Sequence, residues 1–252
     1  MSVRIAIPVP TSIDTDYNTR ALPPYLQALQ SAGATPILIS LDDKPADVAR
    51  ILAKVQGVLL PGSKFDVDPQ KYGALKDPAC NPSDPAREAV EELLLQDAFN
   101  LHKPILAICY GIQSLNVWLN GTLIQDLPNS GNTQINHSPG RAVHEAHPIC
   151  IKPGSLISRL ANEATEGTVN SSHHQAVLTS GNNLRVTAIS SIDEVIEAVE
   201  LESPDHWVLG VQWHPERTYT TSPLSRAFFC AFVHAAEAWK PRAIHESVAI
   251  AQ

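Results

Sequence analysis

The sequence predicts an α/β fold with a mostly parallel central sheet and helices on both faces. The first half alternates short, wholly apolar runs with segments whose apolar residues recur at helical spacing. Strands buried on both faces of a parallel sheet have this composition. The 252 residues, 44% of them hydrophobic and 17% charged, provide enough apolar side chains for one large core.

The elements of the first half are expected in a regular order. Asp84 and Pro85 have the residue types of a helix N-cap and first helical position, so they predict a helix that runs to Leu101. In chain order, the expected elements are a strand at 3–9, a helix with the face Leu22, Tyr25, Leu26 and Leu29, a strand at 35–39, a helix with the face Val48, Ile51, Leu52 and Val55, a strand at 58–60, the helix that Asp84 begins, and a strand at 104–108.

The second half is expected to add a small β-rich part. Residues 184–189 and 195–201 predict a hairpin around the turn at 190–194, and residues 224–239 predict a closing helix. We expect one domain over residues 1–240 and a C-terminal tail over 241–252. Two stretches with little periodicity predict loops, at 64–84 and 129–140. The first is a candidate lid or substrate-binding loop, although an inert surface insertion would have the same composition.

Cys109 is the first candidate catalytic residue. It follows the apolar run 104–108, and the next residues, Tyr110 to Leu119, have apolar positions at helical spacing. A strand, a sharp turn and a helix form a nucleophile elbow, here with cysteine at its tip. Gly111 lacks a Cβ and would allow strand and helix to approach closely. The helix N-terminus is expected to favour a thiolate, so that iodoacetamide should label Cys109 before Cys80, Cys150 and Cys230. The alternative is a buried structural cysteine.

A second apolar strand ends at His214. Glu216 lies two positions later, and Pro215 between them favours an extended backbone, so both side chains are expected on one side. A thiol, an imidazole and a carboxylate in this arrangement indicate a Cys-His-Glu triad. The two segments lie over a hundred residues apart, and their meeting in one site favours a single α/β unit.

Composition excludes several classes of protein. The net charge is −8 and no basic run occurs, so nucleic acid is not an expected partner. The N-terminus lacks the apolar core of a signal peptide, and no window is long and apolar enough for a membrane span, so a cytoplasmic protein without membrane association is expected. The four cysteines form no C-x-x-C pair, which argues against a disulfide framework and a zinc site.

Several segments together resemble class I glutamine amidotransferases and, within that fold, the gamma-glutamyl-gamma-aminobutyrate hydrolase family. The resemblance runs from about Val3 to Ala236. The segments that carry it are Pro61-Gly62-Ser63, Asp66-Val67-Asp68-Pro69, Ile108-Cys109-Tyr110-Gly111-Ile112-Gln113, Asn170-Ser171-Ser172-His173-His174-Gln175, Ile196-Glu197-Ala198-Val199-Glu200 and Gly210-Val211-Gln212-Trp213-His214-Pro215-Glu216. The family implies a flavodoxin-like three-layer fold, hydrolysis of γ-glutamyl amides through a glutamyl thioester, and a place in polyamine (putrescine) degradation.

The resemblance also implies roles for residues around the triad. The backbone N–H groups of Tyr110 and of the turn Gly62-Ser63 would stabilise the oxyanion. Gln113 and the segment Ser172-His173-His174 would bind the glutamyl group. Tyr110 and Lys64-Phe65 depart from the residues common in the family, and the Tyr110 side chain is expected to shape the leaving-group pocket.

The family implies no cofactor, and we expect no metal. Adjacent residues of a strand point in opposite directions, so His173 and His174 should not share an ion, and no third ligand stands at a recognisable spacing. His137, His144 and His147 are expected to be polar loop or packing residues. The expected partner is a small-molecule substrate, with a homodimer possible. Two alternatives stay open, namely the glutaminase subunit of an amidotransferase, which would deliver ammonia to a separate synthase, and a non-catalytic binding relative of the same fold.

Overall fold

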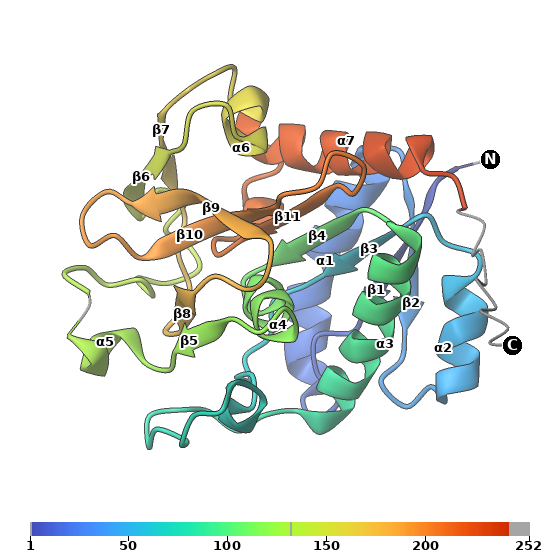
Figure 1. Ribbon diagram of the computed structural model, residues 1–252, viewed down its shortest axis with the longest axis horizontal. Helices are drawn as coiled ribbons and strands as arrows, with labels where there is room; N and C mark the ends of the chain where they lie inside the picture. Colours follow the sequence, from blue (N-terminus) through green and yellow to red (C-terminus); the bar gives the residue numbers. More distant parts are fainter. Residues whose placement is uncertain (1, 132, 242–252) are drawn as a thin grey trace, which may run out of the picture.

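The computed structural model describes residues 2–131 and 133–241 (Figure 1). Within this part, eleven strands form one sheet, whose main path has the order β2-β1-β3-β4-β11-β10-β9-β6-β7. The strands are β1 (Arg4–Pro8), β2 (Thr35–Ile39), β3 (Gly57–Leu60), β4 (Ile105–Ile108), β5 (Thr122–Ile124), β6 (His147–Ile151), β7 (Glu166–Val169), β8 (Ala176–Thr179), β9 (Leu184–Ser190), β10 (Ile196–Leu201) and β11 (Val208–Val211). The helices are α1 (Thr15–Ser31), α2 (Pro45–Leu52), α3 (Pro85–Leu101), α4 (Tyr110–Trp118), α5 (Leu127–Ser130), α6 (Leu156–Leu160) and α7 (Pro223–Ala238), with 3₁₀ turns η1 (Pro69–Tyr72) and η2 (Pro215–Arg217).

Five parallel strands form the centre of the molecule. Strands β2, β1, β3, β4 and β11 pair in parallel, and β4 is flanked by β3 on one side and β11 on the other. All residues of β3, β4 and β11 are buried. The wholly apolar runs of the sequence are therefore the inner strands, and the predicted fold class is confirmed.

Helices cover both faces of this sheet. Alternate residues of β4 separate the two cores, because Leu106 and Ile108 pack with α1 and α7, whereas Ile105 and Ala107 pack with α2, α3 and α4. Phe228, Phe229 and Phe232 of α7 fill the first core. The second core is built from aliphatic side chains of α3, and Figure 1 shows α3 in front of the sheet with α1 behind it.

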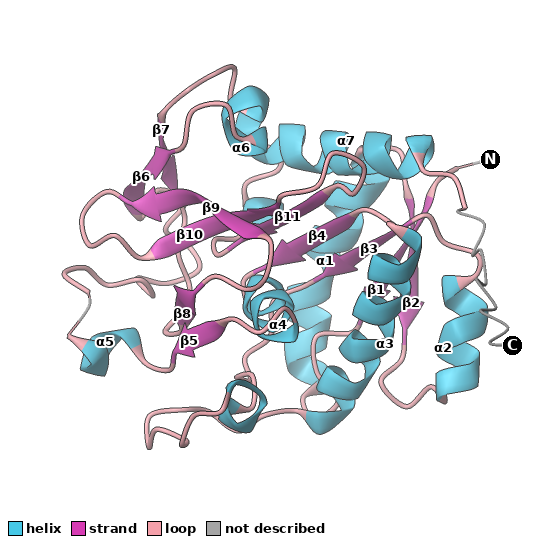
Figure 2. Cartoon of the chain, viewed as in Figure 1, coloured by secondary structure: helices cyan, strands magenta, loops and turns pink. Residues whose placement is uncertain are grey.

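The remaining strands continue the sheet in antiparallel order. Strands β10, β9, β6 and β7 follow β11, and β5 with β8 branches from β10 (Figure 2). The hairpin expected at 184–201 is confirmed as β9 and β10. The pairing of β9 with β10 contains register shifts between Ile196 and Ala198, and Glu197 lies at this irregularity.

Local signals at the element ends also agree with the structure. Asp84 caps α3 by accepting a hydrogen bond from the backbone N–H of Arg87. Residues 61–84 contain no strand and a single 3₁₀ turn, as expected for a loop. The assignment of residues 1–240 to one domain and 241–252 to a tail stays a prediction, and residues 242–252 lie outside the described part. Over the described ranges, no helix combines the length and apolarity that a membrane crossing requires.

Candidate active site

Cys109 lies at the junction of β4 and α4 in a strained backbone conformation. Its φ is +54° and its ψ is −106°, a region of backbone conformation that residues other than glycine rarely occupy. The backbone N–H of Cys109 donates to the carbonyl oxygen of Val211 at 2.9 Å, which ties the turn to β11. A Cβ on Gly111 would come within 2.3 Å of the Leu60 carbonyl oxygen, so glycine is required at this position. These features form the predicted elbow.

His214 and Glu216 follow the neighbouring strand β11. The Nδ1 atom of His214 lies 2.8 Å from Oε1 of Glu216, and both side chains are buried. Because a carboxylate only accepts, Nδ1 carries the proton and Nε2 is left with its lone pair. The buried Nε2 atom has no hydrogen-bond partner among the described residues. His214 is therefore held in the tautomer that a general base needs.

The turn after β3 lies beside both Cys109 and His214. A Cβ placed on Gly62 would come within 3.1 Å of Cε1 of His214 and 3.4 Å of Cβ of Cys109. The three segments converge because β3, β4 and β11 are parallel neighbours whose carboxyl ends share one edge. The fold thus brings Gly62, Cys109 and His214 together.

Burial determines the protonation of this site. It raises the pKa of the Cys109 thiol to about 12, and the nearby charge of Glu216 acts in the same direction, against Arg217 and the Tyr110 N–H. The helix N-terminus, expected to favour a thiolate, does lower the pKa through the Tyr110 N–H, but burial outweighs it in the free protein. Burial also lowers the pKa of His214. At Glu216, the contacts with His214 and Arg217 outweigh the effect of burial, so the pKa of its carboxyl lies below the ordinary value. The resting site holds a thiol, a neutral imidazole and a carboxylate.

Two residues that the sequence analysis did not assign to the site hold the histidine. The hydroxyl of Tyr25, on α1, lies 3.4 Å from Nδ1 of His214 and accepts from the Gly62 N–H at 3.1 Å. The Asn170 side chain hydrogen-bonds both to the backbone N–H and to the carbonyl oxygen of His214. Tyr25 looked like one more apolar position of a helical face, and nothing local in the sequence marks it.

A cavity of about 140 Å³ lies next to Cys109. Most of the residues expected to bind substrate line it, together with the first residues of the 64–84 loop. The lining comprises Ser63, Lys64, Phe65, Asp66, Cys109, Gln113, Ser138, Ser172, His173, His174 and Gln175. A larger cavity of about 630 Å³ opens near Pro104, Trp207 and Val208, where β4 and β11 begin. Its place at the opposite end of the strands separates it from the thiol, so the smaller cavity is the candidate substrate pocket.

Gln113 is oriented by its neighbours. Its side-chain NH₂ donates to the carbonyl oxygen of Gln175 at 3.1 Å and to Oε1 of Gln212 at 3.2 Å. Both amide hydrogens are thereby used, and the Gln113 carbonyl oxygen is the group available to a ligand. An oxygen acceptor in this place suits an ammonium group.

Tyr110 does not lie where the sequence analysis expected. Its side chain is 2% exposed and packs in the core under the Arg87 guanidinium, whose central carbon is 5.0 Å from the ring centroid. The ring is absent from the cavity lining, so the expectation that it shapes a leaving-group pocket is wrong. Its backbone N–H, next to the Cys109 sulfur, keeps its expected place.

His174 joins three segments at the rim of the cavity. Its Nε2 lies 3.0 Å from Oδ1 of Asp66, and its Nδ1 lies 3.0 Å from Oδ1 of Asp126. The hydrogen bond to Asp66, supported by Asp126, raises the pKa of His174 to about 9. A protonated His174 therefore fastens the 64–84 loop to the segment after β5.

His173 belongs mainly to a different cluster. Its ring faces Glu197, as do the rings of His137 and His147, and their potential ligand atoms all lie within 4.8 Å of one another. The sequence analysis found no third ligand near His173 and expected His137 and His147 to be loop or packing residues. What spacing along the chain did not indicate is that the fold brings three imidazoles and a carboxylate together from four separate segments.

Comparison with known proteins shows the family of this chain. The family model of peptidase C26 matches residues 9–216, which include Gly62, Cys109, His214 and Glu216. The chain belongs to the peptidase C26 family. This is a family of glutamine amidotransferase-like hydrolases, so the resemblance seen in the sequence is confirmed.

Two of the curated relatives carry different kinds of name. The gamma-glutamyl-gamma-aminobutyrate hydrolase PuuD of Escherichia coli K12 is 33% identical over 219 residues, which cover 84% of this chain and 85% of PuuD. A Mycobacterium tuberculosis protein named as a candidate glutamine amidotransferase is 36% identical over 205 residues, 81% of this chain. The match spans 64% of the length of that relative.

The solved structures support the fold. A candidate GMP synthase component from Thermoplasma acidophilum superposes with a TM-score of 0.65 at 13% identity, covering 95% of this chain and 96% of the other. At this identity the likeness concerns the fold alone, and it is the class I glutamine amidotransferase fold.

Proposed function

We propose that this protein hydrolyses γ-glutamyl amide bonds with Cys109 as nucleophile, His214 as general base and acid, and Glu216 as the group that orients His214. The observation that carries the proposal is the convergence at Gly62 of the strained Cys109 and of a His214 whose Nδ1 is fixed by Glu216. A non-catalytic binding protein would have no need of the strained backbone at Cys109 or of a buried imidazole with an unpartnered Nε2.

Acylation begins from the neutral pair. As the Cys109 sulfur attacks the amide carbon, its proton passes to Nε2 of His214, so no standing thiolate is needed. The buried Glu216 carboxylate stabilises the imidazolium that forms. The negative charge on the substrate oxygen would be met by the backbone N–H groups of Tyr110 and Ser63, since the Gly62 N–H is already bonded to Tyr25.

The intermediate then collapses to a thioester. His214 gives its proton to the leaving nitrogen, and the amine departs. Water next attacks the thioester carbon while Nε2 of His214 takes its proton, and that proton returns to sulfur as glutamate is released. Each half-reaction begins and ends with a neutral imidazole.

The pocket favours a small polar acyl group. A volume of about 140 Å³ suits a glutamyl group better than a peptide. The carbonyl oxygen of Gln113 would accept from the α-ammonium, and Ser172 would contact the same end. Asp66, in the 64–84 loop, also lines the cavity and is paired with His174.

We propose γ-aminobutyrate as the amine and, with it, a role in polyamine breakdown. PuuD, whose name states this substrate, matches over 84% of the chain. The second candidate is a glutaminase that passes ammonia to a separate synthase. It is favoured by the M. tuberculosis relative, which is 36% identical.

One experiment separates the two candidates. Purified full-length protein is incubated with γ-glutamyl-γ-aminobutyrate, other γ-glutamyl amides, the β-aspartyl analogue and glutamine, and glutamate release is measured for the parent, Cys109→Ala and Cys150→Ala. The last variant is the matched control, since Cys150 is an exposed cysteine of β6.

The expected result is rapid release from γ-glutamyl-γ-aminobutyrate, slow release from glutamine, and no release by Cys109→Ala, with Cys150→Ala like the parent. The glutaminase would be supported instead if all amides except glutamine were turned over slowly and if an added synthase accelerated glutamine turnover. Full activity of Cys109→Ala would refute both.

A further inference from the structure

The cluster of three histidines around Glu197 is unusual for its orphaned polar atoms. The side chains of His137, His147 and His173 are each 1% exposed, and Glu197 is fully buried. Five buried atoms of the cluster have no hydrogen-bond partner among the described residues. They are His137 Nδ1, His147 Nε2, His173 Nε2, Glu197 Oε1 and Glu197 Oε2. A buried carboxylate must be compensated by positive charge, which at Glu197 either a protonated imidazole of the cluster or a bound cation can supply.

In the rings of His147 and His173, the nitrogen that faces away from Glu197 (the outer nitrogen) determines the protonation of the nitrogen that faces it (the inner nitrogen). His147 Nδ1 lies 3.3 Å from the Pro148 carbonyl oxygen, and His173 Nδ1 lies 2.9 Å from the Gln175 carbonyl oxygen. Since a carbonyl oxygen only accepts, each outer nitrogen must carry a proton. In the neutral rings, the inner nitrogens therefore point lone pairs at the carboxylate.

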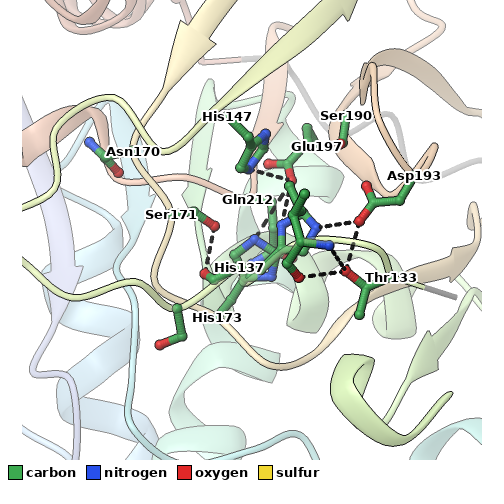
Figure 3. Close-up of polar contacts among 12 residues, drawn as sticks. Thr133, His137, His147, Asn170, Ser171, His173, Ser190, Asp193, Glu197 and Gln212 are labelled. Atoms are coloured by element: carbon green, nitrogen blue, oxygen red, sulfur yellow. Dashed lines mark hydrogen bonds and ion pairs between the residues drawn. The ribbon is translucent and has the colours of Figure 1, made fainter. Parts of the chain in front are cut away.

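The third ring is held in the same way by a carboxylate. His137 Nε2 lies 3.1 Å from Oδ2 of Asp193, which in turn accepts from the Thr133 hydroxyl at 2.7 Å (Figure 3). A carboxylate behind a histidine, itself hydrogen-bonded, is the usual support of an imidazole that ligates a metal. Figure 3 shows the ring of His147 and the Glu197 carboxylate brought toward His137 and His173.

The distances from the Glu197 carboxylate to the three rings suit ligands of one ion better than hydrogen bonds. Glu197 Oε1 lies 3.4 Å from His137 Nδ1, 3.4 Å from His147 Nε2 and 3.6 Å from His173 Nε2. Direct N–H···O bonds would be about 2.7–3.2 Å long. Two ligands of a tetrahedral zinc ion, each about 2.0–2.1 Å from the metal, lie about 3.3–3.4 Å apart.

We propose that His137, His147, His173 and Glu197 form a closed, four-coordinate site for a divalent transition metal, with zinc as the best fit. Three imidazole nitrogens and one carboxylate oxygen are ligands that zinc accepts, and the absence of a thiolate from this set disfavours copper(I). Because the protein supplies four ligands and the site is buried, the metal has a structural role and takes no part in the chemistry at Cys109.

The site would fasten the wall of the substrate pocket. The backbone N–H of His173 and the Ser171 hydroxyl both donate to the His137 carbonyl oxygen, which joins the loop before β6 to the loop before β8. The carbonyl oxygen of Glu197 accepts from the backbone N–H of Gln212, whose side chain orients Gln113. Metal binding would thus stabilise the positions of Ser172, which is adjacent to His173, and of Gln113. Both residues line the substrate pocket.

The test uses the full-length protein, purified from cells grown with added zinc. Bound metal is counted by mass spectrometry after dialysis, the unfolding temperature is followed with and without a chelator, and Co²⁺ is added to metal-free protein to detect the visible absorption of a tetrahedral site. The variants are Glu197→Gln, which keeps the shape and removes the charge, and Asp193→Asn. His144→Ala is the matched control, an exposed histidine near His147 in the sequence.

The parent and His144→Ala are expected to hold about one ion per chain, to unfold at a lower temperature after chelation, and to develop the cobalt absorption. Glu197→Gln should lose all three properties, and Asp193→Asn should bind metal about 10–100-fold more weakly. If the parent takes up neither Zn²⁺ nor Co²⁺, or if Glu197→Gln binds as His144→Ala does, the proposal is overturned. Should Glu197→Gln fail to fold, the parent and Asp193→Asn still decide the outcome. Metal binding does not depend on amide hydrolysis, so failure here leaves the proposed function untouched.

Discussion

The side-chain amide of Asn170 holds the backbone of His214 by two reciprocal hydrogen bonds. Its Nδ2 donates to the His214 carbonyl oxygen at 2.8 Å, and the His214 N–H donates to its Oδ1 at 2.9 Å. Asn170 is buried and begins the loop that contains Ser172 and His173. The imidazole position is thus coupled to the same loop that lines the substrate pocket.

Asn170→Ala is expected to lower kcat about 100-fold with little change in KM, because a displaced base costs rate without removing a substrate contact. Steady-state kinetics on a γ-glutamyl amide measure this effect. Asn182→Ala changes an exposed asparagine and should behave like the parent. A rise in KM with unchanged kcat would instead assign Asn170 to substrate binding.

Glu216→Gln keeps the shape of the orienting group and removes its charge. The buried Glu216 carboxylate holds Nδ1 of His214 at 2.8 Å, so we expect kcat to fall about 10³–10⁴-fold. Glu237→Gln, on the exposed side of α7, is the control. A parent-like rate of Glu216→Gln across the pH range would reduce the triad to a dyad.

Gly111→Ala tests the close packing of the elbow. The new Cβ would meet the Leu60 carbonyl oxygen at 2.3 Å, a backbone atom that cannot rotate away. Overpacking of this kind costs about 1–3 kcal/mol or more, which should appear as a lower free energy of unfolding in urea. At Gly167 the nearest atom to an added Cβ is 3.7 Å away, so Gly167→Ala should be nearly neutral. Equal stability of the two variants would contradict the packing argument.

The raised pKa of His174 predicts that the attachment of the 64–84 loop depends on pH. Its pKa is raised from 6.5 to about 9 in the folded protein, so its contribution to stability is fully present below pH 6.5 and is lost as pH rises through about 9. The difference in stability between the parent and His174→Asn should therefore narrow as pH increases over this window. Limited proteolysis of the loop should become faster in the parent over the same range.

The control for this pH effect is His234→Asn, because the His234 side chain is 84% exposed. That variant should follow the parent at every pH. A difference between the parent and His174→Asn that stays constant from pH 6.5 to 9 would show that the ion pairs with Asp66 and Asp126 are unimportant.

Cysteine labelling should depend on the reagent. The Cys109 thiol is buried and has a pKa of about 12, whereas Cys150 and Cys230 are exposed. Iodoacetamide is therefore expected to modify Cys150 and Cys230 first, in contrast to the order expected from the helix N-terminus alone. A γ-glutamyl chloroketone, which binds beside His214, should modify Cys109 first. Peptide mapping measures both orders, and preferential modification of Cys109 by iodoacetamide would mean that a thiolate exists without substrate.

The sequence by itself determined the alternation of strands and helices, the elbow at Cys109, and the His214-Glu216 pair. Each of these depends on residues close together in the chain: an apolar run that ends abruptly, a glycine beside a tight turn, and two side chains on one extended segment. Periodicity and turn chemistry are local properties, so a single sequence reveals them.

Only the tertiary structure decided where other side chains point and what surrounds them. The orientation of Tyr110 into the core, the contact of Tyr25 with His214 and the high pKa of Cys109 all depend on packing between distant segments. The cluster around Glu197 is the clearest case. Its four residues come from two loops and two strands, and Glu197 lies at a register shift of β10, so neither spacing nor alternation could indicate it. Residues that converge from distant segments leave no local pattern in the sequence. For that reason the cluster around Glu197 became evident only in the folded structure.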